Sequence, residues 1–426
     1  MSLVKTSLLN GIAVLVKALS MFVLNKVLAV YAGPSGYAVI GQLQNALTMI
    51  NTLSIGAVNT GVTKYTAEYA DDLQRQAKVW QSATALALVS SLTIALLVGL
   101  FSRPLAGYFL HNDDLYGVFI AVALSLSFFT LHALLLAILN GRKEVGRYVT
   151  ASISASLVSL ALTSLLAYKY GLYGALLSIG IGQGAIFFTT LAVCRRTSWF
   201  RLHLLFGRWQ SAIVLDLFKF AAMAVTAAIC LPVAQVLIRS HLIHRFGIDA
   251  AGYWEAMWRL SSAYLIIITM TLSVYYLPRL SELKGNRAIF GEICSGYLLI
   301  LPAAVVGGGV IYLLRDFIIH LLFTPDFMPM RELFAWQLLG DALKLGSWLV
   351  ASVMLGKAMF KLYIVSEIIF AALFYGLTVW FTGSDGLQGV VKAYAVNNLV
   401  YWIFMVVSIA IVLKSSHRTA PVDGQA

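Results

Sequence analysis

The chain has 426 residues, of which 60% are hydrophobic and only 11% charged, and its mean hydropathy is +0.85. Because soluble domains carry roughly 25% charged residues, this composition excludes a water-soluble enzyme. The formal net charge is +12. Most of the basic residues lie between apolar segments, which indicates membrane topology and requires no nucleic-acid partner.

The apolar residues recur in segments of about twenty residues, the length that crosses a bilayer as an α-helix. Several segments contain no charge, for example VWQSATALALVSSLTIALLVGLF from Val79. The ten-residue alternation typical of a transmembrane β-barrel is not found. The sequence therefore predicts an all-α integral membrane protein with twelve transmembrane helices, at 6–30, 37–60, 79–101, 116–139, 148–168, 172–194, 214–238, 253–277, 293–314, 333–354, 362–382 and 387–413.

We expect the first predicted span to be retained in the folded protein and not removed as a signal peptide. It has no small-residue cleavage site, and it carries Lys17 and Lys26 inside its apolar run. Only AGPSGY separates it from the second span, and Gly33, Pro34 and Gly36 predict a tight turn there.

The longest polar connection, RRTSWFRLHLLFGRWQS from Arg195, mixes aromatic and basic residues as segments at a membrane surface do. It divides the chain into two six-helix lobes around a central cavity, an architecture found in transporters. The predicted parts are an N-terminal lobe at 1–194, a cytoplasmic interfacial linker at 195–213, a C-terminal lobe at 214–413 and a cytoplasmic tail at 414–426. A second amphipathic segment, RDFIIHLLFTPDF from Arg315, predicts a short helix at the outer interface that ends before Pro325.

The basic residues in the loops predict the orientation. Eighteen lie on the side that holds both termini, and six on the opposite side: Arg103, Lys169, Arg239, Arg245, Arg315 and Arg331. Because cytoplasmic loops carry the excess of Lys and Arg, both termini are predicted to be cytoplasmic.

Charged residues within the spans are the candidate functional groups, since a charge at the centre of a lipid-facing helix costs roughly 2.5–3.5 kcal/mol. The spans contain six cations and four deep acids: Lys17, Lys26, Lys219, Arg259, Lys344 and Lys392, with Asp216, Glu255, Asp341 and Glu367. Three cations have an acid within one helical turn, which predicts the pairs Asp216–Lys219, Glu255–Arg259 and Asp341–Lys344. The acids either couple transport to an ion or serve as structural partners.

Depth separates the cations. Lys17 and Lys344 lie about eleven residues from either end of their spans, at the midplane of the bilayer. They favour a polar, electropositive cavity. Lys26, Lys219 and Lys392 lie nearer the span ends, where they either reach the headgroups or join the same anion site.

The second span carries a polar stripe in GQLQNALTMINTLSIGAVNTG. Asn45, Thr52 and Asn59 recur every seven residues on one helix face, with Gln42 beside Asn45. The stripe predicts either a cavity wall that hydrogen-bonds sugar hydroxyls or hydrogen bonds between helices, worth roughly 0.6 kcal/mol each in membranes.

Catalytic motifs are absent: the sequence has no Gly-rich phosphate loop, HExxH or GxSxG. The seven histidines are scattered, and Cys194, Cys230 and Cys294 form no CxxC. The sequence therefore predicts no catalytic residue, no metal site and no cofactor.

Four stretches resemble the lipid III and O-antigen flippases of the Wzx type: MSLVKTSLL at the start, GVTKYTAEY from Gly61, SVYYLPRLSEL from Ser273 and LLRDFIIHLLFTPDFMPMRELFAWQLLGDALKLGSW from Leu313. The resemblance runs from Met1 to about Ile411 and is most specific from Leu313 onward. It implies the multidrug/oligosaccharidyl-lipid/polysaccharide exporter superfamily, with twelve helices, two lobes and a cavity that opens alternately to each side.

The resemblance further implies a carrier that moves an undecaprenyl-diphosphate-linked oligosaccharide between the leaflets of a bacterial inner membrane while the polyprenyl tail stays in the lipid. The role of basic cavity residues would then fall to Lys17, Arg259 and Lys344. Candidate partners are a glycan polymerase and chain-length proteins of the same pathway. The alternatives are a drug or cation antiporter of the same fold, which the excess of basic charge disfavours, and a membrane glycosyltransferase or polymerase, which the short loops disfavour.

Overall fold

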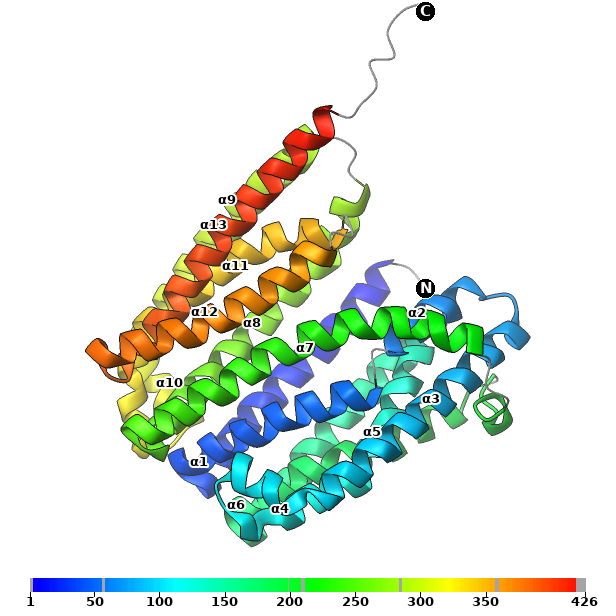
Figure 1. Ribbon diagram of the computed structural model, residues 1–426, viewed down its shortest axis with the longest axis horizontal. Helices are drawn as coiled ribbons and strands as arrows, with labels where there is room; N and C mark the ends of the chain where they lie inside the picture. Colours follow the sequence, from blue (N-terminus) through cyan, green and yellow to red (C-terminus); the bar gives the residue numbers. More distant parts are fainter. Residues whose placement is uncertain are drawn as a thin grey trace, which may run out of the picture. The chain divides into compact units, whose positions relative to one another are not determined.

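Figure 1 shows the computed structural model, which describes residues 3–55, 58–197, 199–207, 211–282, 286–356 and 360–418. Within these residues the chain consists of helices and short connections, without a strand. It forms two compact units, each described by itself. Unit 1 comprises Met1–Glu255 and Leu321–Asp326, and unit 2 comprises Ala256–His320 and Phe327–Ala426.

The predicted spans coincide with the long helices, so the all-α class is confirmed. The long helices are α1 (Leu3–Ile55), α2 (Val58–Glu68), α3 (Leu73–Leu100), α5 (Tyr116–Gly141), α6 (Val145–Arg195), α7 (Ser211–Phe246), α8 (Ile248–Glu282), α9 (Asn286–Leu313), α11 (Phe334–Gly356), α12 (Phe360–Asp385) and α13 (Gln388–Arg418). The short helices are α4 (Ser102–Leu105), η1 (Ala106–Leu110), η2 (Asp113–Leu115), η3 (Leu202–Leu204), α10 (Arg315–Leu322) and η4 (Pro325–Leu333).

Apolar segments form helices here because a helix satisfies every backbone hydrogen bond within itself, which lipid demands. Among the described residues, seven helices are long and apolar enough to cross a membrane. Two of these, in α1 and α6, each hold two predicted spans. The three other predicted spans are α7, α8 and α11, the helices that carry the three predicted ion pairs.

Two glycines divide the double helices. Gly33 has φ +64° inside α1, and Gly171 has φ +56° inside α6, between the predicted spans in each case. Residues with a Cβ rarely adopt positive φ, so glycine allows the chain to turn there. The predicted turn at Gly33 is confirmed.

In unit 1, α1 packs against α6 and α7, and α5 packs against α3 and α6. A buried cluster at the ends of α2, α3 and α5 includes Trp80, Ile138 and Trp199. Trp199 also donates a hydrogen bond to Glu144, and its ring is tilted against that of Trp80, with ring centroids 5.3 Å apart. The predicted linker at 195–213 thus packs onto unit 1 where it is described. The division into two six-helix lobes stays a prediction.

In unit 2, α11 packs against α9, α12 and α13. Its core includes Leu265, Leu345, Leu349 and Met405. The expected short helix before Pro325 is α10, which ends at Leu322. The position of α10 at an outer interface stays a prediction.

Candidate functional site

Asp341 on α11 is the centre of a buried polar cluster in unit 2. Its carboxylate accepts hydrogen bonds from Ser261 (2.7 Å) and Tyr264 on α8, and from Tyr394 on α13 (2.9 Å). Gln337, one turn earlier on α11, donates a fourth at 3.3 Å. Asp341 is 3% exposed. We refer to these five residues as the Asp341 cluster; it joins three helices through one carboxylate.

Helix periodicity places the donors. Ser261 and Tyr264 are three residues apart on α8, and Gln337 precedes Asp341 by four residues on α11. Residues at these spacings lie on the same face of a helix. Four donors around one carboxylate replace the water that a charged group loses on burial. The Asp341 cluster therefore stabilises a buried acid by hydrogen bonds and without a salt bridge to a described residue.

Lys344 does not form the predicted ion pair. Among the described residues no ion pair joins it to Asp341; its ammonium instead lies over the rings of Trp258 (5.5 Å) and Tyr394 (6.0 Å). A spacing of three residues on one helix brings the two side chains near each other, and their charges interact, but it does not make them a salt bridge. Aromatic rings on α8 and α13 stabilise the Lys344 cation by a cation–π interaction.

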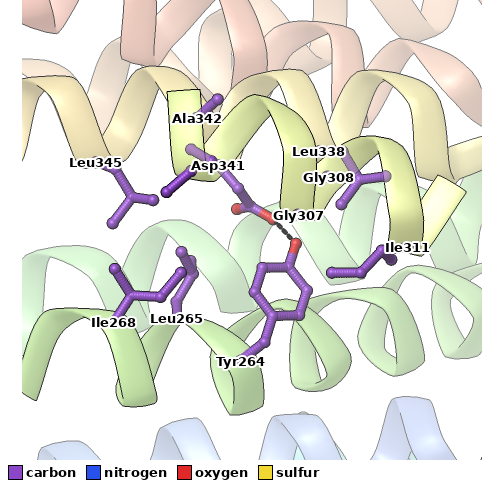
Figure 2. Close-up of a pocket in the computed structure, with 12 residues that line it drawn as sticks. Tyr264, Leu265, Ile268, Gly307, Gly308, Ile311, Leu338, Asp341, Ala342 and Leu345 are labelled. Carbon is purple, nitrogen blue, oxygen red and sulfur yellow. Dashed lines mark hydrogen bonds between the residues drawn. The ribbon is translucent and has the colours of Figure 1, made fainter. Parts of the chain in front are cut away.

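A cavity of about 260 Å³ adjoins Asp341, as Figure 2 shows. Tyr264 points toward the carboxylate and donates the dashed hydrogen bond. The rest of the wall is apolar and consists of Leu265, Ile268, Ala303, Ala304, Gly307, Gly308, Ile311, Leu338, Ala342 and Leu345. The cavity therefore presents one acidic group, already fully hydrogen-bonded, to an apolar space.

A second buried charge cluster, in unit 1, was missed by the sequence analysis. Arg239 was assigned to an outer loop, but it lies in α7, is 1% exposed and forms an ion pair with Glu255. It also donates to Gln42 at 3.0 Å. A Cβ added at Gly41 would collide with Glu255, so glycine allows this close approach. The seventh helix extends to Phe246, beyond the predicted end of its span at 238, and so includes Arg239.

Glu255 and Arg259 were predicted as partners. Glu255 is bonded to Arg239 across α7 and α8, and Arg259 is buried at 8% exposure on α8. The acid that sequence spacing assigned within one helix therefore binds a cation from a neighbouring helix.

The remaining predicted charges are dispersed. Lys17 is exposed on α1, Lys26 donates to the carbonyl of Phe323 at 2.5 Å, and Lys392 forms an ion pair with Asp385. Glu367 accepts a hydrogen bond from Tyr401 at 3.4 Å. The side chains of Asp216 and Lys219 lie outside the described part of the structure.

The polar stripe of the second span divides by environment. Gln42 and Asn45 are buried, and the hydroxyl of Thr52 donates to the carbonyl of Thr48 at 2.7 Å. Asn59 lines a cavity of about 580 Å³ in unit 1. The residues of the stripe are therefore divided between α1 and α2 and differ in their surroundings. No group of three or more metal-ligating side chains occurs among the described residues.

Comparison with known proteins identifies relatives over nearly the whole chain. The family model described as "Polysaccharide biosynthesis protein" matches residues 3–284. The lipid III flippase of Escherichia coli (strain K12) is 32% identical over 403 residues, which cover 94% of this chain and 97% of that protein.

Two solved structures share the fold. An inward-facing multidrug resistance transporter of the MATE family, in the MOP superfamily, has a TM-score of 0.79 at 14% identity and covers 96% of this chain and 99% of its own. The lipid II flippase MurJ in an inward closed conformation has a TM-score of 0.73 at 14% identity, and the match covers 99% of this chain and 94% of that chain. At these identities the likeness concerns the fold alone.

Proposed function

Because the chain belongs to the polysaccharide biosynthesis protein family, we propose that it is a flippase for a polyprenyl-diphosphate-linked oligosaccharide. The observation that carries this proposal is the near full-length similarity to a lipid III flippase. The transport cycle we propose is alternating access, which the likeness to an inward-facing transporter supports. The protein is a multi-pass membrane protein, and its proposed location is a bacterial inner membrane.

The chemistry of such a substrate requires a cation inside the protein. A diphosphate that leaves water needs charged donors in place of its hydration shell. Lys344 is a suitable group, because its ammonium lies over aromatic rings and no salt bridge to a carboxylate holds it among the described residues. Lys17, which is exposed on α1, and Arg259, which is buried on α8, are the further candidates for phosphate binding.

The proposed direction is from the cytoplasmic to the periplasmic leaflet, with both termini cytoplasmic. Labelling in intact cells tests this orientation. In a background without native cysteines, Lys143→Cys is expected to stay protected from a membrane-impermeant maleimide and Asp114→Cys to react. Both positions are exposed. The reverse pattern would overturn the orientation.

We further propose that the glycan polymerase and chain-length proteins of the same pathway bind this protein or act directly after it. Removal of the periplasmic product by a polymerase would draw the substrate outward without an ion gradient. Co-purification after cross-linking in the native host tests this association, and recovery of neither protein would contradict it.

A drug or cation antiporter is the second candidate, because the fold is shared with a multidrug transporter. The relevant cavity beside Asp341 is apolar and acidic, as a cation site would be. The carboxylate, however, already accepts four hydrogen bonds, so its capacity to bind a cation is largely used. The similarity to a flippase favours the first candidate.

The decisive experiment is reconstitution in liposomes. Wild-type protein is expected to move a labelled undecaprenyl-diphosphate-linked oligosaccharide between leaflets, and Lys344→Gln to reduce the rate at least tenfold. Lys78→Gln, at an exposed lysine between predicted spans, is the matched control. Failure of the wild type to move this lipid, together with gradient-driven export of a cationic drug, would replace the proposal with the antiporter.

A further inference from the structure

A cavity of about 580 Å³ lies in unit 1 where α2, the end of α5 and the start of α6 meet. It is lined by Asn59, Thr60, Thr63, Lys64, Ala133, Leu136, Ala137, Asn140 and Tyr148. We refer to it as the α2–α5 pocket. Its volume is within the range of roughly 300–1,000 Å³ that is typical of small-molecule sites.

Some polar side chains of this pocket make no hydrogen bond to a described residue. Those of Asn59, Thr60, Asn140 and Tyr148 make no hydrogen bond to any described residue, although Asn59 and Tyr148 are half-buried. Thr63, in contrast, donates to the carbonyl of Ala137 at 3.2 Å.

Elsewhere in unit 1, several polar side chains inside the helix bundle bond to one another. Ser54 and Thr130 lie 3.0 Å apart, and His132 and Thr190 lie 2.8 Å apart. Because buried polar groups normally find partners, the half-buried side chains of Asn59 and Tyr148 have capacity for a ligand at this cavity, beside the exposed Thr60 and Asn140.

The lining chemistry specifies the class of ligand. Amide and hydroxyl groups both donate and accept hydrogen bonds, as the hydroxyls of a sugar do. Ala133 and Leu136 add an apolar wall that suits the C–H face of a sugar ring. Lys64 supplies positive charge at the same cavity, with its ammonium 5.1 Å from the ring centroid of Tyr65.

We propose that the α2–α5 pocket binds the phosphate-linked sugar of the transported lipid, with Lys64 on the phosphate and Asn59 and Asn140 on the sugar hydroxyls. The inference rests on the proposed flippase function and adds a subsite to it. The pocket lies beside loops predicted to be cytoplasmic, so it receives the substrate before translocation.

Binding in lipid nanodiscs tests the subsite with two probes, an undecaprenyl-diphosphate-linked oligosaccharide and undecaprenyl diphosphate without sugar. Asn59→Ala with Asn140→Ala is expected to weaken binding of the first probe at least tenfold and to leave the second unchanged. Lys64→Gln is expected to weaken both probes, and Lys78→Gln neither.

A second measurement does not depend on lost affinity. In a cysteine-free background, maleimide labelling of Asn140→Cys is expected to slow severalfold with the oligosaccharide probe and not with the sugar-free probe. Unchanged labelling, or equal affinity of the double variant and the wild type for the first probe, would overturn the pocket while the flippase function stands. A wild type that neither binds nor moves the first probe would overturn both.

Discussion

The Asp341 cluster in unit 2 and the α2–α5 pocket in unit 1 use similar polar side chains but differ in how these are bonded. In the Asp341 cluster, two tyrosines, a serine and a glutamine all donate to one carboxylate. In the α2–α5 pocket, two asparagines, a threonine and a tyrosine face a cavity without bonding to described residues.

This difference distinguishes a structural network from a binding surface. The donors around Asp341 come from three helices, so their hydrogen bonds hold α8, α11 and α13 together. Asn59, Thr60, Asn140 and Tyr148 join no helices through hydrogen bonds to described residues, so their capacity remains for a ligand. We therefore expect changes in closed networks to alter stability and changes in the pocket to alter binding.

The largest effect is expected for the other closed network, the ion pair between Arg239 and Glu255. Arg239→Met breaks the salt bridge to the buried carboxylate of Glu255, which is expected to lower the free energy of unfolding by about 3–5 kcal/mol. Adding Glu255→Gln is expected to recover most of that loss. Unfolding in mixed detergent micelles measures both, and a double variant no more stable than Arg239→Met would contradict the pairing.

A smaller loss is expected when the Asp341 cluster loses its acceptor. Asp341→Leu leaves four donors unsatisfied, and at roughly 0.6 kcal/mol for each hydrogen bond in a membrane the loss is on the order of 2–3 kcal/mol. The same unfolding assay applies. Wild-type stability in this variant would show that the donors find other partners.

The third prediction separates Asp341 from Lys344. Asp341→Asn is expected to lower stability by about 1 kcal/mol, since part of the acceptor capacity is lost. Because no salt bridge joins the two residues, adding Lys344→Gln is expected to recover none of the stability that Asp341→Asn loses, and their shared contact with Tyr394 makes the two effects non-additive. Recovery of stability in the double variant, as expected for Arg239 and Glu255, would restore the ion-pair interpretation.

The smallest effect is expected in the pocket. Asn59→Ala and Asn140→Ala remove no hydrogen bond to a described residue, so each is expected to change the free energy of unfolding by less than about 0.5 kcal/mol. A loss above about 1 kcal/mol in either variant would assign these side chains to the fold and remove the contrast with the Asp341 cluster.

Most of the fold follows from patterns that are local in the chain. Each apolar segment must hydrogen-bond its own backbone, so its length predicts a helix wherever it packs. The turn at Gly33 was also predicted from local sequence, because glycine readily adopts the positive φ that the turn requires.

The sites were predicted less well because partners come from other helices. Spacing brought Asp341 and Lys344 to one face but gave no sign of Trp258 or Tyr394, which are far away in sequence. Arg239 was assigned to a loop because a charged residue usually ends an apolar span. Its buried acceptor, Glu255, lies on the following helix and could not be identified from the sequence.

The sequence by itself determined the membrane class, the helical segments and the family resemblance. The lengths of apolar segments and local motifs depend only on residues that are close to one another in the sequence. Only the tertiary structure decided which polar groups are satisfied. Gln42 and Asn59 belong to one predicted stripe, yet Gln42 bonds to a buried arginine while Asn59 faces a cavity. A hydrogen bond needs a partner within about 3 Å, and packing between helices alone supplies or withholds that partner.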